Sequence, residues 1–245
     1  MLLLLSGEGK GDIGQCISNA VPCCDEAFRP GPMAWIVDQL VERAQGYDYS
    51  HISANRAYFV SKRYLAGNNA PKRGKPTALR GKSRKKETAY FFRNAMALAD
   101  CAKSLASEES DVVIAVLFRD SDGTASAGRG IWQDKYDSIL EGFNLAKFPY
   151  GVAMVPNPKS EAWLLCAIKT PPYMHCEQIE LESGNDKSPN SLKDQLTQAL
   201  APKDGNSQGI SELIREGGID VTRIDMPSFK KFRERLEIVV RKLVG

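Results

Sequence analysis

Three short apolar runs in this chain each lead directly into acidic residues. The runs are residues 2–5, 112–118 and 152–155. The acids that follow them are Glu8, Asp12, Asp120, Asp122 and Glu161. Runs that are hydrophobic throughout are typical of strands buried on both faces, as in a parallel sheet. Because the carboxyl ends of parallel strands share one edge of the sheet, we expect these acids to gather where such folds bind ligands.

The segments between these runs predict the rest of an α/β fold, in which a central and mainly parallel sheet is flanked by helices. A fourth strand is expected at residues 57–60. Apolar residues near a 3.6-residue period predict helices at residues 33–45, 83–107 and 131–147. Strands that alternate with helices in this way indicate a Rossmann-like arrangement.

The length of 245 residues suits one large domain, or one domain with an appendage. We expect a core at residues 1–170 and a mainly helical C-terminal extension at residues 171–245 packed on it. Within the core, residues 6–32 are expected to form a long loop, and a helix is expected to start with Asn157 as its N-cap and Pro158 at its first position. In the extension, residues 171–210 are polar and interrupted by Pro and Gly, and amphipathic helices are expected at residues 211–217 and 228–244.

The opening apolar run is too short for a signal peptide or a membrane span, so we expect a cytoplasmic protein that does not bind membranes. The six cysteines form no CxxC pair, and the chain has two histidines, which argues against a structural zinc site. Reduced and mostly buried thiols are expected. The adjacent His175 and Cys176 leave a reactive pair as an alternative.

Carboxylates at one sheet edge repel one another unless a cation joins them, and oxygen ligands suit Mg²⁺ or Mn²⁺. We therefore predict a metal site formed by Glu8, Asp12, Asp120, Asp122 and Glu161. Two of these acids have simpler explanations. The sequence around Asp122 favours a turn, and a glutamate at position 161 in a first helical turn is stabilised by the helix dipole. Glu161 shares a face with Leu164 and Leu165, however, which favours a bound partner for its charge.

The loop after the first run contains a glycine pattern that resembles the dinucleotide-binding fingerprint. Residues 9–14 fit G-x-G-x-x-G. Glu8 and Asp12 would repel a pyrophosphate, and Pro22 interrupts the helix that should follow. We expect the glycines to let the backbone turn sharply and present both acids, while an ordinary polar turn and a nucleotide-binding enzyme remain alternatives.

One segment carries a large part of the positive charge. The chain has 33 Lys and Arg against 30 Asp and Glu, and residues 62–86 hold ten of the basic residues and no acidic one. They are Lys62, Arg63, Lys72, Arg73, Lys75, Arg80, Lys82, Arg84, Lys85 and Lys86. Phosphates are the natural partner of such a segment, so we predict nucleic-acid binding. A solvated loop is the alternative.

Three sequence strings together resemble a known family. Residues 6–12, 118–123 and 156–165 look like the strand-end motifs of a TOPRIM domain, the topoisomerase–primase fold shared with OLD-type nucleases. The Glu-Ala-Trp-Leu-Leu string and the late Pro-Ser-Phe-x-x-Phe are similar to small bacterial TOPRIM-like proteins of defence islands, often encoded beside an ABC-type ATPase. The resemblance covers about residues 1–170.

The resemblance implies roles for particular residues. In the family, the first glutamate and the Asp-x-Asp motif hold Mg²⁺. These positions correspond to Glu8, Asp120 and Asp122 in this sequence. Asp12 and Glu161 match additional acids of the OLD-like branch. That branch also uses a late lysine, for which the candidates are Lys187, Lys193 and Lys159, with Lys193 taken as the catalytic one. The basic segment has no counterpart in the minimal fold.

Together these features predict a Mg²⁺- or Mn²⁺-dependent nuclease that hydrolyses DNA or RNA and acts in anti-phage defence. The catalytic residues would be Glu8, Asp120, Asp122 and Lys193. Glu8 could bind metal or serve as a general acid or base. The alternative is a non-catalytic or inhibited TOPRIM-like subunit docked on an ABC-type ATPase partner. A homodimer is compatible with either function.

Overall fold

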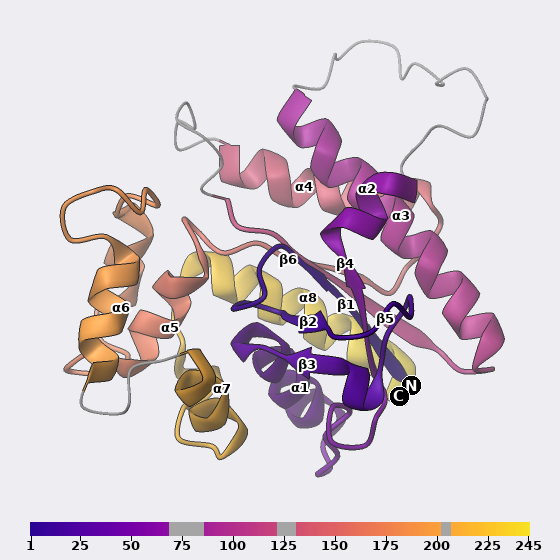
Figure 1. The fold of residues 1–245 in the computed structure, drawn as a ribbon, viewed down its shortest axis with the longest axis horizontal. Helices are drawn as coiled ribbons and strands as arrows, with labels where there is room; N and C mark the ends of the chain where they lie inside the picture. The colour runs from indigo at the N-terminus through magenta and orange to yellow at the C-terminus, as the bar shows by residue number, and fades with distance from the viewer. Residues whose placement is uncertain (69–85, 122–130, 202–206) are drawn as a thin grey trace.

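A parallel sheet forms the centre of the molecule (Figure 1). The computed structural model describes residues 1–68, 86–121, 131–201 and 207–245. Within these residues the sheet has four strands, in the order β4-β1-β5-β6, and all neighbours are parallel. The strands are β1 (Leu2–Gly7), β4 (Ala57–Ser61), β5 (Val113–Phe118) and β6 (Gly151–Met154). The four predicted strands and their parallel arrangement are confirmed.

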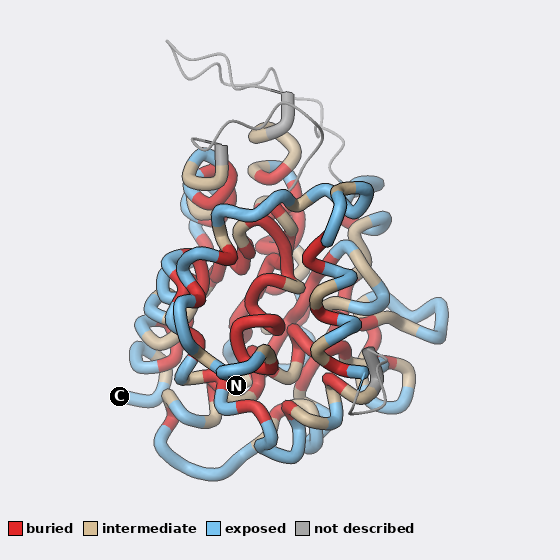
Figure 2. The backbone as a smooth tube through the Cα atoms, turned by 90° about the vertical axis from the view of Figure 1, so that its left-hand side faces the viewer, coloured by how far each residue is buried: buried red, intermediate tan, exposed pale blue. Residues whose placement is uncertain are grey.

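Both faces of the sheet are covered, which is why its strands are apolar throughout. Leu3 and Leu5 point into one hydrophobic cluster, while Leu2 and Leu4 point into the other. Helix α1 (Pro32–Gln45) and helix α8 (Pro227–Val244) cover the first face. Helix α3 (Lys86–Glu108) and helix α4 (Ile131–Leu145) cover the second, with α2 (Lys62–Asn68) beside them. Figure 2 shows the buried backbone enclosed between these layers. The α/β fold with a flanked parallel sheet is therefore confirmed.

The order of the strands places a topological switch point beside β1. From β1 the chain adds β4 on one side, then crosses to add β5 on the other side, and β6 follows beyond it. In open α/β sheets, ligands bind at the carboxyl ends of the strands where the order reverses. Glu8 and Asp12 follow β1, and Asp120 follows β5. Glu8, Asp12 and Asp120 thus follow the two strands at this switch point, whereas Glu161 follows β6 and Asp122 lies outside the described residues.

The expected long loop at residues 6–32 is wrong in part, because it contains a small antiparallel pair. The pair consists of β2 (Gly14–Cys16) and β3 (Phe28–Pro30). The short helix η1 (Asp25–Ala27) lies directly before β3 in the chain. Gly14 has a φ of +120°, and a Cβ there would overlap the Arg29 carbonyl. Strands of three residues are too short to show a two-residue alternation of apolar and polar side chains. Gly14 is the one sequence feature that indicated this pair.

The predicted start of the helix after β6 is also wrong. Helix α5 (Ser160–Ile168) begins three residues after Asn157. The Asn157 side chain instead lies 3.5 Å from the Ser121 hydroxyl, while the Ser160 N–H donates to Asp120 Oδ1 at 3.0 Å. A carboxylate from another strand therefore caps α5, which a local sequence pattern does not reveal.

Beyond residue 170 the chain contains several helices. Helices η2 (Cys176–Leu181) and α6 (Leu192–Leu200) lie in the polar segment 171–210, and α7 (Ser207–Arg215) starts earlier than the helix predicted at residues 211–217. The last helix, α8, is confirmed. Its Phe229 and Phe232 pack on Trp163 of α5 with ring centroids 4.9 and 5.7 Å apart. The extension thus shares one hydrophobic cluster with the sheet, and a domain division at residue 170 stays a prediction.

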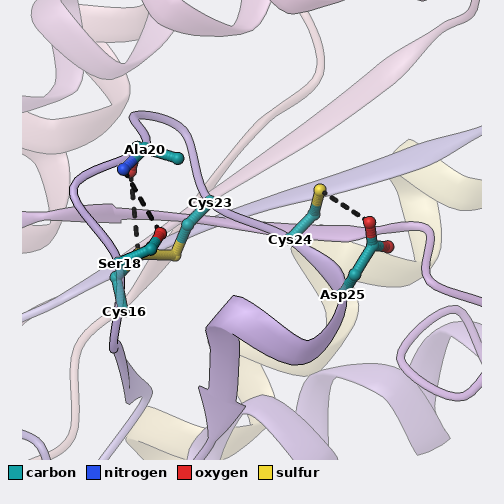
Figure 3. The surroundings of a disulfide bond; sticks show 6 residues. All are labelled: Cys16, Ser18, Ala20, Cys23, Cys24 and Asp25. Carbon is teal, nitrogen blue, oxygen red and sulfur yellow. Dashed lines mark hydrogen bonds between the residues drawn. A yellow bond between two sulfur atoms is a disulfide. The ribbon is translucent and has the colours of Figure 1, made fainter.

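Four of the six cysteines form disulfides, so the expected reduced thiols are wrong for them. Cys16 pairs with Cys23 (Figure 3) and Cys166 pairs with Cys176. Their Cα atoms are 6.1 and 5.2 Å apart, which suits a bridge. The alternative of a reactive His175–Cys176 pair is excluded by the second bridge. Among the described residues, no helix is long and apolar enough to cross a membrane.

The remaining thiols provide a direct check on this pairing. Cys24 and Cys101 are free, and burial is the main cause that raises the pKa of each to about 11. We expect an unreduced, denatured chain to take two alkyl labels by mass spectrometry, and the reduced chain six. In the native state both labels should add slowly at neutral pH, because the thiolate is the reactive form. Six labels without reductant would contradict the pairing.

Candidate functional site

Three acidic side chains from different strand ends converge on Ser160. The Ser160 N–H donates to Asp120 Oδ1 at 3.0 Å, and its Oγ lies 2.6 Å from Asp12 Oδ1 and 3.2 Å from Glu161 Oε2. A hydroxyl has one proton and donates to one carboxylate at a time. We call Asp12, Asp120 and Glu161 with Ser160 the acidic cluster. Its three acids were predicted to gather at this sheet edge, and the structure brings them together on Ser160, which was not predicted.

Backbone contacts hold the β5 end against the connection between β6 and α5. The Ser121 N–H and hydroxyl both donate to the Pro158 carbonyl, at 3.1 and 3.0 Å. The buried Lys135 of α4 donates to the Ser121 carbonyl at 2.6 Å. Arg119 N donates to the Met154 carbonyl at 3.0 Å, which continues the β5–β6 pairing. These bonds fix Asp120 opposite the first turn of α5.

Glycines shape the loop that carries Asp12. A Cβ at Gly7 would overlap Ile13, and one at Gly31 would overlap the Asp12 carbonyl. A Cβ at Gly9 would overlap Asp12 Oδ2, so this glycine leaves room for the carboxylate itself. Packing therefore explains Gly9 and Gly14 of the glycine pattern without a bound pyrophosphate, whereas a Cβ at Gly11 would meet no atom within 4 Å.

The electrostatics of the cluster favour a cation. Burial is the main cause that raises the pKa of Asp12, and the negative charges of Glu161 and Glu8 raise it further. The Ser160 hydrogen bond and the Lys159 charge lower this pKa and offset part of the rise. An added positive charge would stabilise the ionised form of Asp12 in the same way.

Of the three candidate lysines, Lys159 is the one that contacts an acid of the cluster. Its Nζ lies 3.6 Å from Glu161 Oε1 and also contacts Asp186, and its side chain is 6% exposed. The predicted catalytic Lys193 is exposed on α6, and no hydrogen bond or ion pair joins it to the described acids. Lys187 is likewise exposed. The structure therefore favours Lys159 among the three candidates.

Glu8 lies apart from the Ser160 contacts and is held by two cations. Lys62 Nζ lies 2.6 Å from Glu8 Oε2, and Arg119 Nε lies 3.7 Å from Glu8 Oε1. Arg119 is fully buried, and its Nε and Nη2 have no hydrogen-bond acceptor among the described residues. Burial lowers the pKa of Arg119, and Tyr90 and Glu8 raise it. The sequence prediction missed Arg119, although an arginine between a buried strand and Asp120 could have signalled it.

Several predicted residues fall where the structure gives no answer. Asp122 lies outside the described residues, as do Lys72, Arg73, Lys75, Arg80, Lys82, Arg84 and Lys85. Lys86 begins α3, and Arg63 is exposed on α2. Among the described residues, no group of three or more His, Cys, Asp or Glu is arranged to hold a metal ion. The donor types nevertheless fit a hard cation, since all are carboxylate oxygens.

Searches for similar proteins add no further evidence on the family. No family model, curated protein or solved structure matches this chain. The TOPRIM resemblance therefore stays a prediction that depends on the strand-end motifs.

A pair of glycine variants tests the position of the Asp12 carboxylate. Gly9→Ala should displace Asp12 Oδ2, whereas a Cβ at Gly11 meets no atom within 4 Å. If Asp12 acts in catalysis, we expect Gly9→Ala to lower activity about 10- to 100-fold, because misplaced groups cost this much. Gly11→Ala is the matched control and should stay close to wild type. Circular dichroism first establishes that both variants are folded, and their initial rates are then compared. Equal rates would contradict a role of the Asp12 carboxylate in catalysis.

Proposed function

We propose that this chain is a metal-dependent nuclease of TOPRIM type, which hydrolyses phosphodiester bonds in DNA or RNA. The convergence of Asp12, Asp120 and Glu161 at the switch point of the sheet carries the proposal. Oxygen donors from three strand ends suit Mg²⁺ or Mn²⁺, and such ions are common in phosphodiester hydrolysis. The role in anti-phage defence depends on the family resemblance alone.

The chain's own residues have separable tasks in this proposal. Asp12, Asp120, Glu161 and the predicted Asp122 would hold the metal, which when bound would polarise the phosphate and lower the pKa of water. Ser160 holds Asp120 through its backbone N–H, and its hydroxyl donates to Asp12 or to Glu161, one at a time. Lys159 neutralises Glu161 and lies close enough to the cluster to stabilise added charge on a phosphate.

The ion pair between Lys62 and Glu8 links the acidic edge to the basic segment. Lys62 starts α2 directly after β4, so the first residue of the segment is anchored at the carboxyl edge. An incoming phosphate would compete with Glu8 for Lys62, and the released carboxylate could then bind metal or exchange a proton with solvent. Opening of the Lys62 pair would free the Glu8 Oε2 atom for either task.

The same ion pair favours a second candidate function. Glu8 is neutralised by Lys62 and faces Arg119, and the described residues alone do not assemble a three-ligand metal site. Both features suit an inhibited or non-catalytic subunit. The ABC-type ATPase partner of this alternative depends on the family resemblance. Stoichiometric co-purification with such a partner, with no cleavage by either form, would support the alternative.

A cleavage assay tests the proposed function. Purified chain is offered supercoiled DNA, single-stranded DNA and tRNA, each with Mg²⁺, with Mn²⁺ or with EDTA. We expect cleavage of at least one substrate that requires the metal and is lost with EDTA. Cleavage that survives EDTA, or that Asp120→Ala leaves unchanged, would contradict the proposal, since a contaminating nuclease would then explain the activity.

A further inference from the structure

A second site lies on the other side of the Asp12 loop. A cleft of about 520 Å³ opens between the β2–β3 pair, α1 and α7, and helices α1 and α7 lie side by side (Figure 1). We call it the Trp35 cleft. The side chains that matter for its chemistry are Lys10, Gln15, Arg29, Trp35, Glu212 and Arg215. None of them belongs to the predicted nucleic-acid-binding segment.

The Trp35 cleft and the acidic cluster share one loop. Lys10 and Gly11 line the cleft, and Asp12 follows them directly in the chain. The Asp12 carbonyl accepts from the Met33 N–H at 2.9 Å at the start of α1. Gly31, another wall residue, packs so closely that a Cβ would overlap that carbonyl. One short loop therefore contributes Lys10 and Gly11 to the cleft and the Asp12 side chain to the acidic cluster.

The cleft combines an aromatic surface with unneutralised cations. Trp35 is half-buried at the N-terminal end of α1 and is held in place by the core. Lys10 and Arg29 are exposed, and no ion pair joins either of them to a described residue. Arg215 is different, because it pairs with Glu212 at 2.9 Å and Glu216 at 3.4 Å. An open cation beside a fixed indole is the combination that binds a base and its phosphate.

The size of the cleft and the polarity of its wall support the same ligand class. Its volume falls in the range of about 300–1,000 Å³ that small-molecule sites occupy. Gln15 contributes an amide that can both donate and accept, which suits the edge of a base. A base held in a duplex cannot present its face to a recessed indole, so the ligand base must be unpaired.

We propose that the Trp35 cleft binds one unpaired nucleotide of a single strand, whose neighbouring phosphodiester lies at the acidic cluster. The base stacks on Trp35, and Lys10 and Arg29 pair with the adjoining phosphate. This inference rests on the proposed nuclease function, because it assigns that site a single-stranded substrate. A free nucleotide has the same base-and-phosphate chemistry and is distinguished below.

Binding without metal tests the cleft separately from cleavage. Fluorescence anisotropy in EDTA compares a labelled 12-nucleotide single strand, a hairpin duplex of equal length and unlabelled AMP as competitor. We expect the single strand to bind more tightly than the duplex, and Trp35→Leu to weaken it about five- to 100-fold, the range for one stacked base. Trp35→Phe keeps an aromatic face and should recover much of the lost affinity.

The salt dependence of binding tests the phosphate contact. Arg29→Gln should lower the slope of log K against log salt concentration by about 0.7, as expected for one lost phosphate contact. Lys230→Gln, at an exposed lysine on α8 outside the cleft, is the matched control and should leave the slope unchanged.

The outcomes separate this inference from the proposed function. Single-strand binding that Trp35→Leu and Arg29→Gln leave unchanged overturns the inference, even if the chain cleaves nucleic acid. Binding that depends on Trp35, in a chain that cleaves nothing with any metal, supports a single-strand site in the cleft and overturns the nuclease proposal together with the placement of a substrate phosphodiester at the acidic cluster. AMP that binds as tightly as the oligonucleotide overturns the single-strand assignment, because the cleft would then be a free-nucleotide site.

Discussion

Asp120→Asn is expected to abolish metal-dependent cleavage while the chain stays folded. The change removes the negative charge that a divalent cation needs, and we expect activity to fall about 100-fold or more. The asparagine oxygen can still accept the Ser160 N–H that Asp120 Oδ1 accepts at 3.0 Å. Asparagine and aspartate are similar as helix caps, so the free energy of unfolding should change by less than about 1 kcal/mol. The variant therefore separates a chemical role of Asp120 from its structural one.

The measurement pairs initial cleavage rates with urea denaturation of the same preparations. Asp134→Asn removes a charge from an exposed aspartate in the first turn of α4 and serves as the control. The control should retain the rate of the wild type. A folded Asp120→Asn protein with full activity would show that this carboxylate is only a cap for α5.

Phe232→Ala is expected to lower the free energy of unfolding by about 3–5 kcal/mol. Phe232 is fully buried and stacks on Trp163 of α5, with Phe229 at the edge of the same indole. The Trp163 Nε1–H also donates to Ser228 Oγ at 2.8 Å, at the start of α8. Truncation of the Phe232 ring leaves a cavity between α5 and α8. The loss in free energy of unfolding should therefore be among the largest that a single substitution causes.

Ile238→Ala on the same helix is the control for that change. Ile238 is 50% exposed, so its removal should cost about 0.5 kcal/mol or less. Urea midpoints and m-values of the two variants provide the comparison. Equal and small effects would mean that α8 does not stabilise the sheet as described, and that residues 171–245 behave as a separate extension.

The sequence predicted those features that depend on long or strongly apolar patterns. Residues 2–5 and 113–118 are apolar throughout because both faces of the sheet are covered, and this pattern predicted β1 and β5. Their parallel pairing then placed Glu8 and Asp120 at one edge. The helices α1, α4 and α8 followed from their apolar periodicity. In each of these elements, burial on one or both faces requires apolar residues at regular positions. Such a pattern can be recognised within the segment itself.

Features that depend on contacts between distant segments could not be predicted. The Asp120 cap on α5 joins residues 40 positions apart, and the Lys159 contact with Asp186 joins residues 27 apart. The disulfides were missed because spacings of seven and ten residues match no common motif. The Lys62–Glu8 pair required β4 to lie beside β1, which local patterns do not determine.

Binding of Mn²⁺ to the purified chain tests the metal site most directly. The free Mn²⁺ signal in electron paramagnetic resonance is titrated with wild type, Asp120→Asn and the Asp134→Asn control, and Mg²⁺ is then added as a competitor. We expect wild type and the control to bind about one or two ions saturably, with displacement by Mg²⁺ and at least about tenfold weaker binding by Asp120→Asn. Weak, unsaturable binding that is the same in all three proteins would contradict a metal site at the carboxyl edge of the sheet.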